Sequence, residues 1–113
     1  MKPTETYTPA PREDPFDLDL FITAQEGMFE AALSELRRGR KRSHWMWFIF
    51  PQLAGLGRSS TARRFALQSL DEAHTYLYHP VLGPRLIECC RALLSVHGKS
   101  ASEIMGHPDY LKL

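Results

Sequence analysis

Apolar residues recur at intervals of three and four along most of the chain after residue 15, which is the spacing of one face of an α-helix. In residues 16–36 this stripe is formed by Leu18, Ile22, Phe29, Ala32, Leu33 and Leu36. Gln25 falls in the same stripe, so its amide must find partners in a buried turn or face a ligand. We expect Gly27 to divide the segment into two helices and Gly39 to follow the second one.

The next part of the chain predicts a helix that begins near Ser59 or Ser60, both good N-cap residues, and ends at His79-Pro80. A capping box that starts at Ser69 leaves open that this helix restarts there. Its inward face is expected to consist of Ala62, Phe65, Ala66, Leu70, Ala73 and Leu77.

A further helix is expected to begin at Gly83-Pro84 and to end at Gly98. Its inward face would consist of Leu86, Ile87, Cys90, Leu93, Leu94 and His97. A second capping box at Ser100 opens a short final helix. The sequence shows no strand alternation and no repeat, so the predicted class is all-α, a compact bundle of about four to six short helices.

Residues 1–15 carry four prolines and no apolar periodicity, which predicts a disordered lead-in before a single helical domain over 16–113. The chain has no apolar run near the ~20 residues of a membrane span, and its first residues do not resemble a secretory signal. Cys89 and Cys90, the only cysteines, are adjacent, which disfavours a structural disulfide and suits a reducing compartment. We therefore expect a cytoplasmic protein that does not enter the membrane.

The net charge of +1 gives no overall attraction to nucleic acid, so a nucleic-acid partner would depend on a local patch. Such a patch exists at Arg37–Arg42, with five cations in six residues. It runs directly into the motif Ser43-His44-Trp45-Met46-Trp47-Phe48-Ile49-Phe50-Pro51-Gln52. The apolar stretch of this motif fits either a buried helical turn or a strand, and its periodicity does not decide between them.

Basic side chains beside aromatic rings can hold a phosphate while a ring stacks on a base. Our first hypothesis is therefore a site for a phosphate-bearing or nucleotide-like small molecule, with His44 as the acid or base. If residues 43–50 are helical, one face is shared by Lys41, His44, Trp45 and Phe48. The candidate ligand contacts are Gln25, Lys41, Trp45, Trp47, Gln52, Arg58, Ser59, His79 and Arg85.

Each of these residues also has a purely structural interpretation. The tryptophans can be core residues and His44 a cap, while the arginines form a solvated helix end. The run from Gly55 to Ser60 has the chemistry of an anion site ahead of a helix, yet a turn with a serine cap explains it as well. His79, at the corner before Pro80, either enters a cleft with Arg85 or bonds the backbone.

The histidines and cysteines lack zinc-ligand spacing, so the sequence predicts neither a metal nor a cofactor, and it leaves open whether the protein is an enzyme. A second hypothesis is an adaptor module that docks to protein or nucleic acid through Arg37–Arg42 and an exposed aromatic side chain. It predicts an open basic surface and binding that weakens with salt, whereas the first hypothesis predicts residues that converge on one cleft. A third option is a structural subunit whose tryptophans are all core.

Over residues 14–113 the chain resembles a bacterial family called domain of unknown function 1810. The resemblance is carried above all by the motif Lys41–Gln52, and further by Asp14-Pro15-Phe16, Ala24-Gln25, Gly39, the run Gly55–Ser59, Leu70-Asp71-Glu72-Ala73 and the run His79–Leu86. It implies a compact helical domain without an established activity. Some members carry the label calpastatin, but nothing in this sequence supports protease inhibition.

Proteins similar to this one typically continue past the run Asp109–Leu113 into another helical segment with a Ser/Thr-Leu-Phe pattern. This chain stops there, so we expect Tyr110, Leu111 and Leu113 to lie at an unprotected end. Either the chain is a truncated form, or a partner subunit covers these residues. A homo-oligomer is therefore among the predicted partners.

Overall fold

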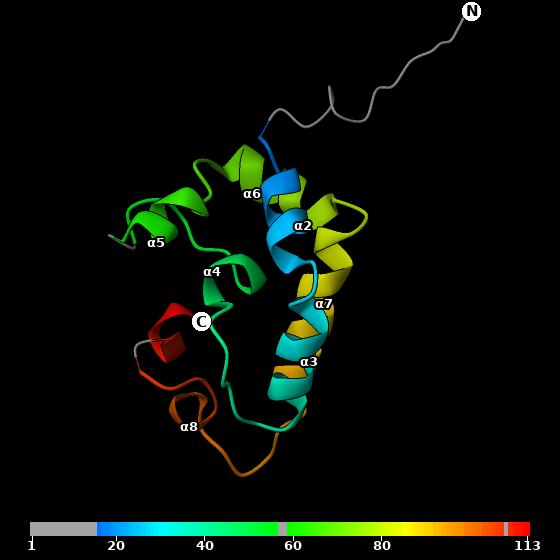
Figure 1. Cartoon of the computed structure of the whole chain (residues 1–113), viewed down its shortest axis with the longest axis vertical. Coiled ribbons are helices and arrows are strands. Elements are labelled where there is room, and N and C mark those ends of the chain that lie inside the picture. The colour runs from blue at the N-terminus through cyan, green and yellow to red at the C-terminus, as the bar shows by residue number, and fades with distance from the viewer. Residues whose placement is uncertain (1–15, 57–58, 108) are drawn as a thin grey trace, which may run out of the picture.

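The computed structural model describes residues 16–56, 59–107 and 109–113, which form helices joined by loops (Figure 1). The helices are α2 (Asp19–Gln25), α3 (Phe29–Arg37), α4 (Met46–Ile49), α5 (Ser60–Arg64), α6 (Leu70–Tyr78), α7 (Leu82–Leu94) and α8 (Ala101–Met105), followed by a 3-10 helix (Asp109–Lys112). These residues contain no strand, and Leu53 and Leu67 form an isolated parallel bridge. The predicted all-α class is confirmed, while the predicted lead-in lies outside the described residues.

The break predicted at Gly27 is confirmed, because α2 ends at Gln25 and α3 begins at Phe29. Gly27 and Gly39 each have a φ of +76°, a left-handed conformation that glycine adopts without steric cost. The N–H of Gly39 returns to the carbonyl of Leu36 at 3.0 Å, so it closes the end of α3 as expected. The two glycines thus set both ends of α3.

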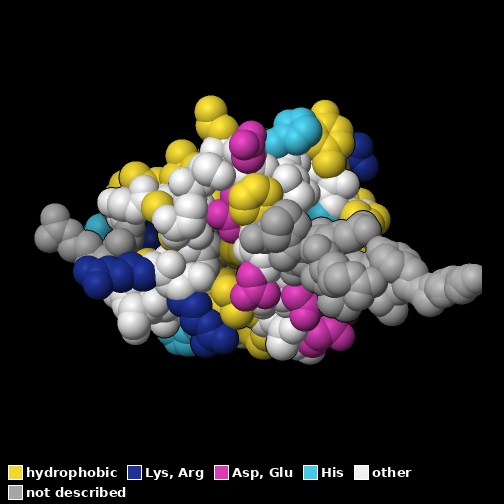
Figure 2. All heavy atoms as spheres, turned by 90° about the horizontal axis from the view of Figure 1, so that it is seen from above, with side chains coloured by type: hydrophobic (Ala, Val, Ile, Leu, Met, Phe, Trp, Pro, Cys, Tyr) yellow, Lys and Arg dark blue, Asp and Glu magenta, His cyan; other side chains and the backbone are white. Residues whose placement is uncertain are grey.

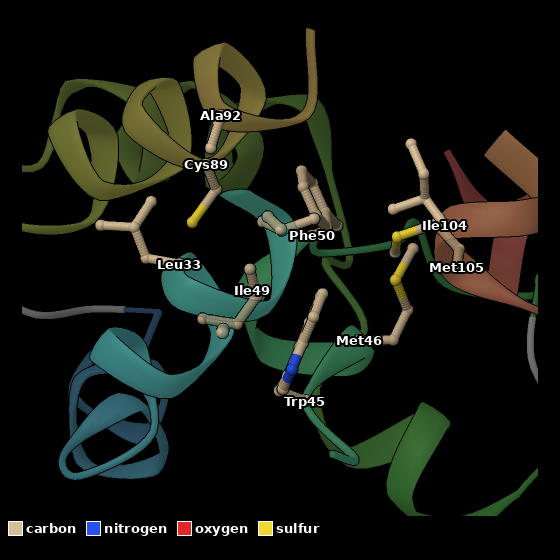
Figure 3. Packing of buried hydrophobic residues seen from close by; sticks show 11 residues of the cluster. Leu33, Trp45, Met46, Ile49, Phe50, Cys89, Ala92, Ile104 and Met105 are labelled. Atoms are coloured by element: carbon tan, nitrogen blue, oxygen red, sulfur yellow. The ribbon is translucent and has the colours of Figure 1, made fainter. Parts of the chain in front are cut away.

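The larger of two apolar clusters lies where α3 and α7 run side by side (Figure 1). Trp45 and the residues of α4 fill its centre, and Ile104 and Met105 of α8 close it on the far side (Figure 3). Its buried members are Ala32, Leu33, Leu36, Trp45, Met46, Ile49, Phe50, Cys89, Ala92, Ile104 and Met105. Trp45 has no exposed surface, so this cluster is built around the first tryptophan of the motif.

The second cluster joins α2 to α6 and to the start of α7, and its buried members are Leu18, Phe21, Phe65, Leu67, Tyr76 and Leu82. The ring of Phe21 meets Tyr76 edge-on, with centroids 5.1 Å apart, and lies 5.6 Å from Phe65. Such aromatic pairs add about 0.5–1.5 kcal/mol beyond the area they bury. The short helix α4 touches both clusters, because Phe48 packs against each of them.

One long helix between Ser59 and His79 was the main prediction for this region, and the structure instead has two helices, α5 and α6. The restart at Ser69 is correct, since its hydroxyl accepts the N–H of Glu72 at 3.1 Å. The break resets the helical phase, so the predicted inward face is wrong at Leu70, which is 81% exposed, and at Leu77, which is 47% exposed.

The predicted inward face of α7 is also rotated. Leu94 is 79% exposed and Ile87 44% exposed, whereas Cys89 rather than Cys90 is buried. The helix packs against α3 and α6, and the buried face runs through Leu82, Gly83, Cys89 and Ala92. The small side chains on that face allow the neighbouring helices to approach closely.

The charged side chains at the end of the molecule that carries α2, α5 and α6 are separated by sign. Figure 2 shows most Lys and Arg side chains of this end on the α5 side, and most Asp and Glu side chains nearer α2. Arg63 and Arg64 of α5 are both exposed, as are Asp17 and Asp71. Arg63 and Arg64 therefore form a second basic patch, which belongs to a different part of the sequence from Arg37–Arg42.

Candidate functional site

A cavity of about 300 Å³ lies beside Trp47, between the loop that follows α4 and the C-terminal 3-10 helix. It is lined by Trp47, Gln52, Leu53, Leu56, Ala62, Phe65, Leu111 and Lys112. Two of these residues, Trp47 and Gln52, are candidate ligand contacts from the sequence. Most of the described lining is apolar, with the amide of Gln52 and the ammonium of Lys112, which is the usual composition of a small-molecule site.

The conformation of the tryptophan motif separates its two indoles. The helix α4 spans only Met46–Ile49, so the helical alternative holds for a single turn and the strand alternative is wrong. Trp45 precedes this turn and is fully buried, whereas Trp47 lies within it and is partly exposed. The shared face predicted for Lys41, His44, Trp45 and Phe48 is therefore not formed, because residues 43–45 are not helical.

The side-chain amide of Gln52 is held by hydrogen bonds to two backbone carbonyls. Its Nε2 donates to the carbonyl of Phe50 at 3.0 Å and to the carbonyl of Lys112 at 2.9 Å. Both amide protons are thereby used, and Oε1 accepts no hydrogen bond from another described residue. Gln52 thus holds the C-terminal segment in place and keeps an acceptor available.

Lys112 is the charged residue among the described residues that line the cavity. Its Nζ lies 5.2 Å from the centroid of the Trp47 ring and 3.5 Å from Oδ1 of Asp109. The other carboxylate oxygen of Asp109 binds Nζ of Lys41 at 2.8 Å, and this second ammonium lies 4.9 Å from the Trp45 ring. Asp109 therefore bridges two lysines, each placed over one of the two tryptophans.

Glu35 organises the opposite end of the motif, and the sequence reasoning did not single it out. Its buried carboxylate accepts hydrogen bonds from N–H of Arg42 at 2.8 Å, from N–H and Oγ of Ser43 at 2.9 and 2.7 Å, and from Nε1 of Trp45 at 2.8 Å. Burial by itself would raise the pKa of Glu35, but the hydrogen bonds from Ser43, Arg42 and Trp45 lower it to about 2. A signal was available, because Glu35 lies among the apolar positions of α3.

Gln25 and Arg85 are brought together, but in the interior between α2 and α7. Gln25 donates to the carbonyl of Phe48 at 2.6 Å and to the hydroxyl of Tyr76 at 3.3 Å, and its Oε1 accepts from Arg85 at 3.1 Å. Arg85 also lies 5.1 Å from the ring of Phe29. Gln25 is only 2% exposed. Of the two alternatives, a buried structural role or contact with a ligand, the structure therefore has the buried role.

The other candidate residues occupy separate places. His44 is exposed, and Nδ1 of His79 accepts the N–H of Val81 at 3.0 Å and caps the turn into α7. The Ser59 hydroxyl accepts the N–H of Ala62 at 3.0 Å as the N-cap of α5. Arg58 lies outside the described residues. The candidate ligand contacts are thus divided among several places, and the cavity unites Trp47 with Gln52.

The two thiols lack the setting of a nucleophile. Burial, with smaller contributions from Cys90 and Glu88, raises the pKa of Cys89 to about 12, and burial also raises the pKa of Cys90. Thiolates are therefore disfavoured at neutral pH. Within 16–56, 59–107 and 109–113, His, Cys, Asp and Glu side chains form no group of three or more that could hold a metal ion. In the same part of the chain, no helix is both long and apolar enough to cross a membrane.

Comparisons with known proteins identify relatives but no activity. A family model described as Protein of unknown function (DUF1810) matches residues 15–113. A solved structure, that of the conserved hypothetical protein Rv1873 from Mycobacterium tuberculosis, is similar with a TM-score of 0.87 and 55% sequence identity. That match covers 88% of this chain and 71% of the mycobacterial chain. The curated proteins contain no match.

Proposed function

The chain belongs to the DUF1810 family of proteins of unknown function, and we propose that it binds a nucleotide-like small molecule in the cavity beside Trp47. The ligand has a flat ring system and one anionic group, such as a phosphate. The observation that carries this proposal is the meeting of an indole, an ammonium and an amide oxygen that accepts from no described residue, at one largely apolar cavity.

The size of the cavity supports a ligand of this class. Its volume of about 300 Å³ lies at the lower end of the range of roughly 300–1,000 Å³ that is usual for ligand sites. The leucine side chains and Phe65 provide the apolar contact that a ring system requires. A single mononucleotide fits this description better than a dinucleotide or a polymer.

The charge beside the cavity favours an anion. Lys41 and Lys112 contribute two positive charges, and Asp109 contributes one negative charge between them. Lys41 holds Asp109 at the shorter distance and its side chain is 7% exposed, whereas that of Lys112 is 26% exposed. The uncompensated positive charge thus belongs to Lys112, where an entering phosphate can reach it.

Each polar group has a defined part in the proposed complex. The indole of Trp47 provides aromatic surface for the ring, Oε1 of Gln52 accepts from an amine or ring N–H, and Lys112 binds the phosphate. His44 is not part of the cavity lining, so we propose binding and no reaction. A cytoplasmic location and a covering partner subunit stay predictions from the sequence.

Thermal unfolding in the presence of nucleoside monophosphates tests the proposal directly. A ligand that binds the folded chain raises the melting temperature according to RT ln(1 + [L]/Kd), about 2.7 kcal/mol at one hundred times Kd. We expect at least one monophosphate to raise it, and the matching nucleoside or inorganic phosphate alone to act much more weakly. If no member of the panel shifts the transition, the proposed function is wrong.

Variants locate the binding in the cavity. Lys112→Gln removes the charge and should reduce the affinity for the monophosphate about tenfold or more, while the affinity for the nucleoside changes little. Trp47→Leu should weaken both ligands. Arg91→Gln is the matched control, because it removes one exposed positive charge from α7, away from the cavity. An equal loss of binding in the control would place the site elsewhere.

A further inference from the structure

Three arginines that follow α3 are exposed and have no acidic partner among the described residues. Arg38, Arg40 and Arg42 are exposed, and their side chains make no hydrogen bond or ion pair with another described residue. The other two cations of the same run are engaged, since Arg37 binds Glu88 at 3.2 Å and Lys41 binds Asp109. Residues 38–42 are called the arginine loop below.

Hydrogen bonds to Glu35 and Ile104 fix the backbone of the arginine loop. N–H of Arg40 donates to the carbonyl of Glu35 at 3.0 Å, and N–H of Lys41 donates to the carbonyl of Ile104 at 2.7 Å. N–H of Arg42 donates to the Glu35 carboxylate, as described above. Arg40 and Arg42 are exposed on either side of the largely buried Lys41, so the fixed backbone presents them on one surface. A rigid backbone lowers the entropy lost when the loop binds a partner.

The exposed residues of this surface indicate the chemistry of the partner. Protein interfaces are usually built around a buried apolar or aromatic centre, and the arginine loop exposes none. Arginine has a planar fork of donors that binds phosphate oxygens bidentately. Readers of base pairs in duplex DNA place a helix or a ribbon in the major groove, and the loop is neither. We propose that the arginine loop binds the phosphate backbone of nucleic acid without reading its sequence.

This surface is independent of the cavity, because none of the three arginines lines it. The overall charge of +1 does not oppose the proposal, since contact with a few phosphates depends on local charge. Three phosphate contacts give a slope of log K against log salt near −2 for a single strand, at about −0.7 per contact. We therefore expect weak binding that decreases about 10- to 20-fold between 50 and 200 mM salt.

Fluorescence anisotropy of a labelled 20-nucleotide single strand measures this binding with the chain of 113 residues. Arg40→Ser together with Arg42→Ser should weaken it at least tenfold and reduce the salt slope to about −0.7, the value for one contact. The folded state should remain intact, because these side chains make no hydrogen bond or ion pair with another described residue. An unchanged melting temperature in the double variant separates lost binding from unfolding.

The matched control removes two exposed arginines elsewhere, by Arg63→Ser together with Arg64→Ser in α5. We expect it to change the affinity less than twofold. An equal loss in the control would show that binding follows net charge, and salt-independent binding or none at 50 mM salt would also overturn the proposal. Anionic lipid vesicles or polyglutamate bound through the same arginines, with the oligonucleotide left free, would assign the surface to another class of partner.

Discussion

At the scale of single residues, Glu35 combines deep burial with a full set of hydrogen-bond donors. A buried carboxylate is tolerated only when it is paired or hydrogen-bonded, and here the donors are Arg42, Ser43 and Trp45 of one loop. The same carboxylate holds the arginine loop and the indole of Trp45. Its removal would therefore loosen the core and the basic surface together.

The pH dependence of stability follows from the lowered pKa of Glu35. The pKa falls from 4.5 to about 2 on folding, so the carboxylate stabilises the folded state above pH 4.5, and this contribution disappears as the pH falls towards 2. Glu35→Gln should lower the free energy of unfolding by about 3 kcal/mol at pH 7 and by only about 1 kcal/mol near pH 3. Urea denaturation at both pH values measures these differences.

Glu30→Gln is the control for this prediction, because Glu30 is an exposed carboxylate on the same helix. It should change the free energy of unfolding by less than about 0.5 kcal/mol at either pH. A destabilisation by Glu35→Gln that stays the same from pH 7 to pH 3 would contradict the assignment of a charged, hydrogen-bonded carboxylate.

The sequence indicated Gln25 but not Glu35, although both interrupt an apolar stripe. An amide in a stripe is conspicuous, whereas a glutamate on a helix is usually explained as solvated surface charge. The partners of Glu35 come from residues 42–45, and helical periodicity says nothing about the path of that loop. A polar position inside a stripe should therefore be considered a buried centre even when it is ionisable.

At the scale of elements, local signals were more dependable than the predicted inward faces. The caps at Ser59, Ser69 and Ser100 are all formed, because each depends on residues three positions apart. The inward faces of α6 and α7 were misassigned, because a face depends on which neighbours approach and on where a helix is interrupted. Short helices with many leucines leave several faces equally apolar, and only tertiary packing selects one.

The contact between α6 and α7 depends on the absence of a side chain at Gly83. A Cβ at this position would collide with the carbonyl oxygen of Leu77. Helix propensity alone predicts that Gly83→Ala stabilises the protein by about 0.5–1 kcal/mol. We expect the opposite sign, a destabilisation of about 1–3 kcal/mol from overpacking, measured by chemical denaturation.

The sign of this change separates the two explanations. Arg91→Ala, at an exposed position of the same helix, should remain within about 0.5 kcal/mol of the unchanged protein. A stabilised Gly83→Ala variant would show that α6 can move away from α7 at little cost, and that the close approach does not determine the face of α7.

At the scale of the whole molecule, Leu111 and Lys112 near the C-terminus line the cavity beside Trp47, and the sequence alone could not predict this. The predicted class and the predicted single domain follow from patterns within segments. The bond from Gln52 to the carbonyl of Lys112 and the ion pair of Lys41 with Asp109 connect residues that are 60 or more positions apart. No local pattern identifies such pairs, so the sequence marked Trp47 and Gln52 as candidates, and it could not mark Lys112, which lines the same cavity.

The bridge at Asp109 joins the C-terminal segment to the rest of the chain, and its two halves should differ in strength. Asp109→Asn leaves the largely buried ammonium of Lys41 without a counterion, which should cost about 2–4 kcal/mol. Lys112→Met should cost less than about 1 kcal/mol, because its ammonium lies 3.5 Å from the carboxylate and is more exposed. A double-mutant cycle of Lys41→Met and Asp109→Asn should give a coupling of about 1–3 kcal/mol.

The same variants distinguish a tether from an incidental ion pair. If Lys41 and Asp109 hold residues 109–113 against the core, Asp109→Asn should make the peptide bond after Lys112 accessible to trypsin while the cores around Trp45 and Phe21 stay folded. Hydrogen exchange of the amides of α8 and the 3-10 helix would then increase ahead of the rest of the chain. Equal costs for Asp109→Asn and Lys112→Met, with no coupling to Lys41, would instead mean that the ion pair of Lys41 and Asp109 does not retain this segment.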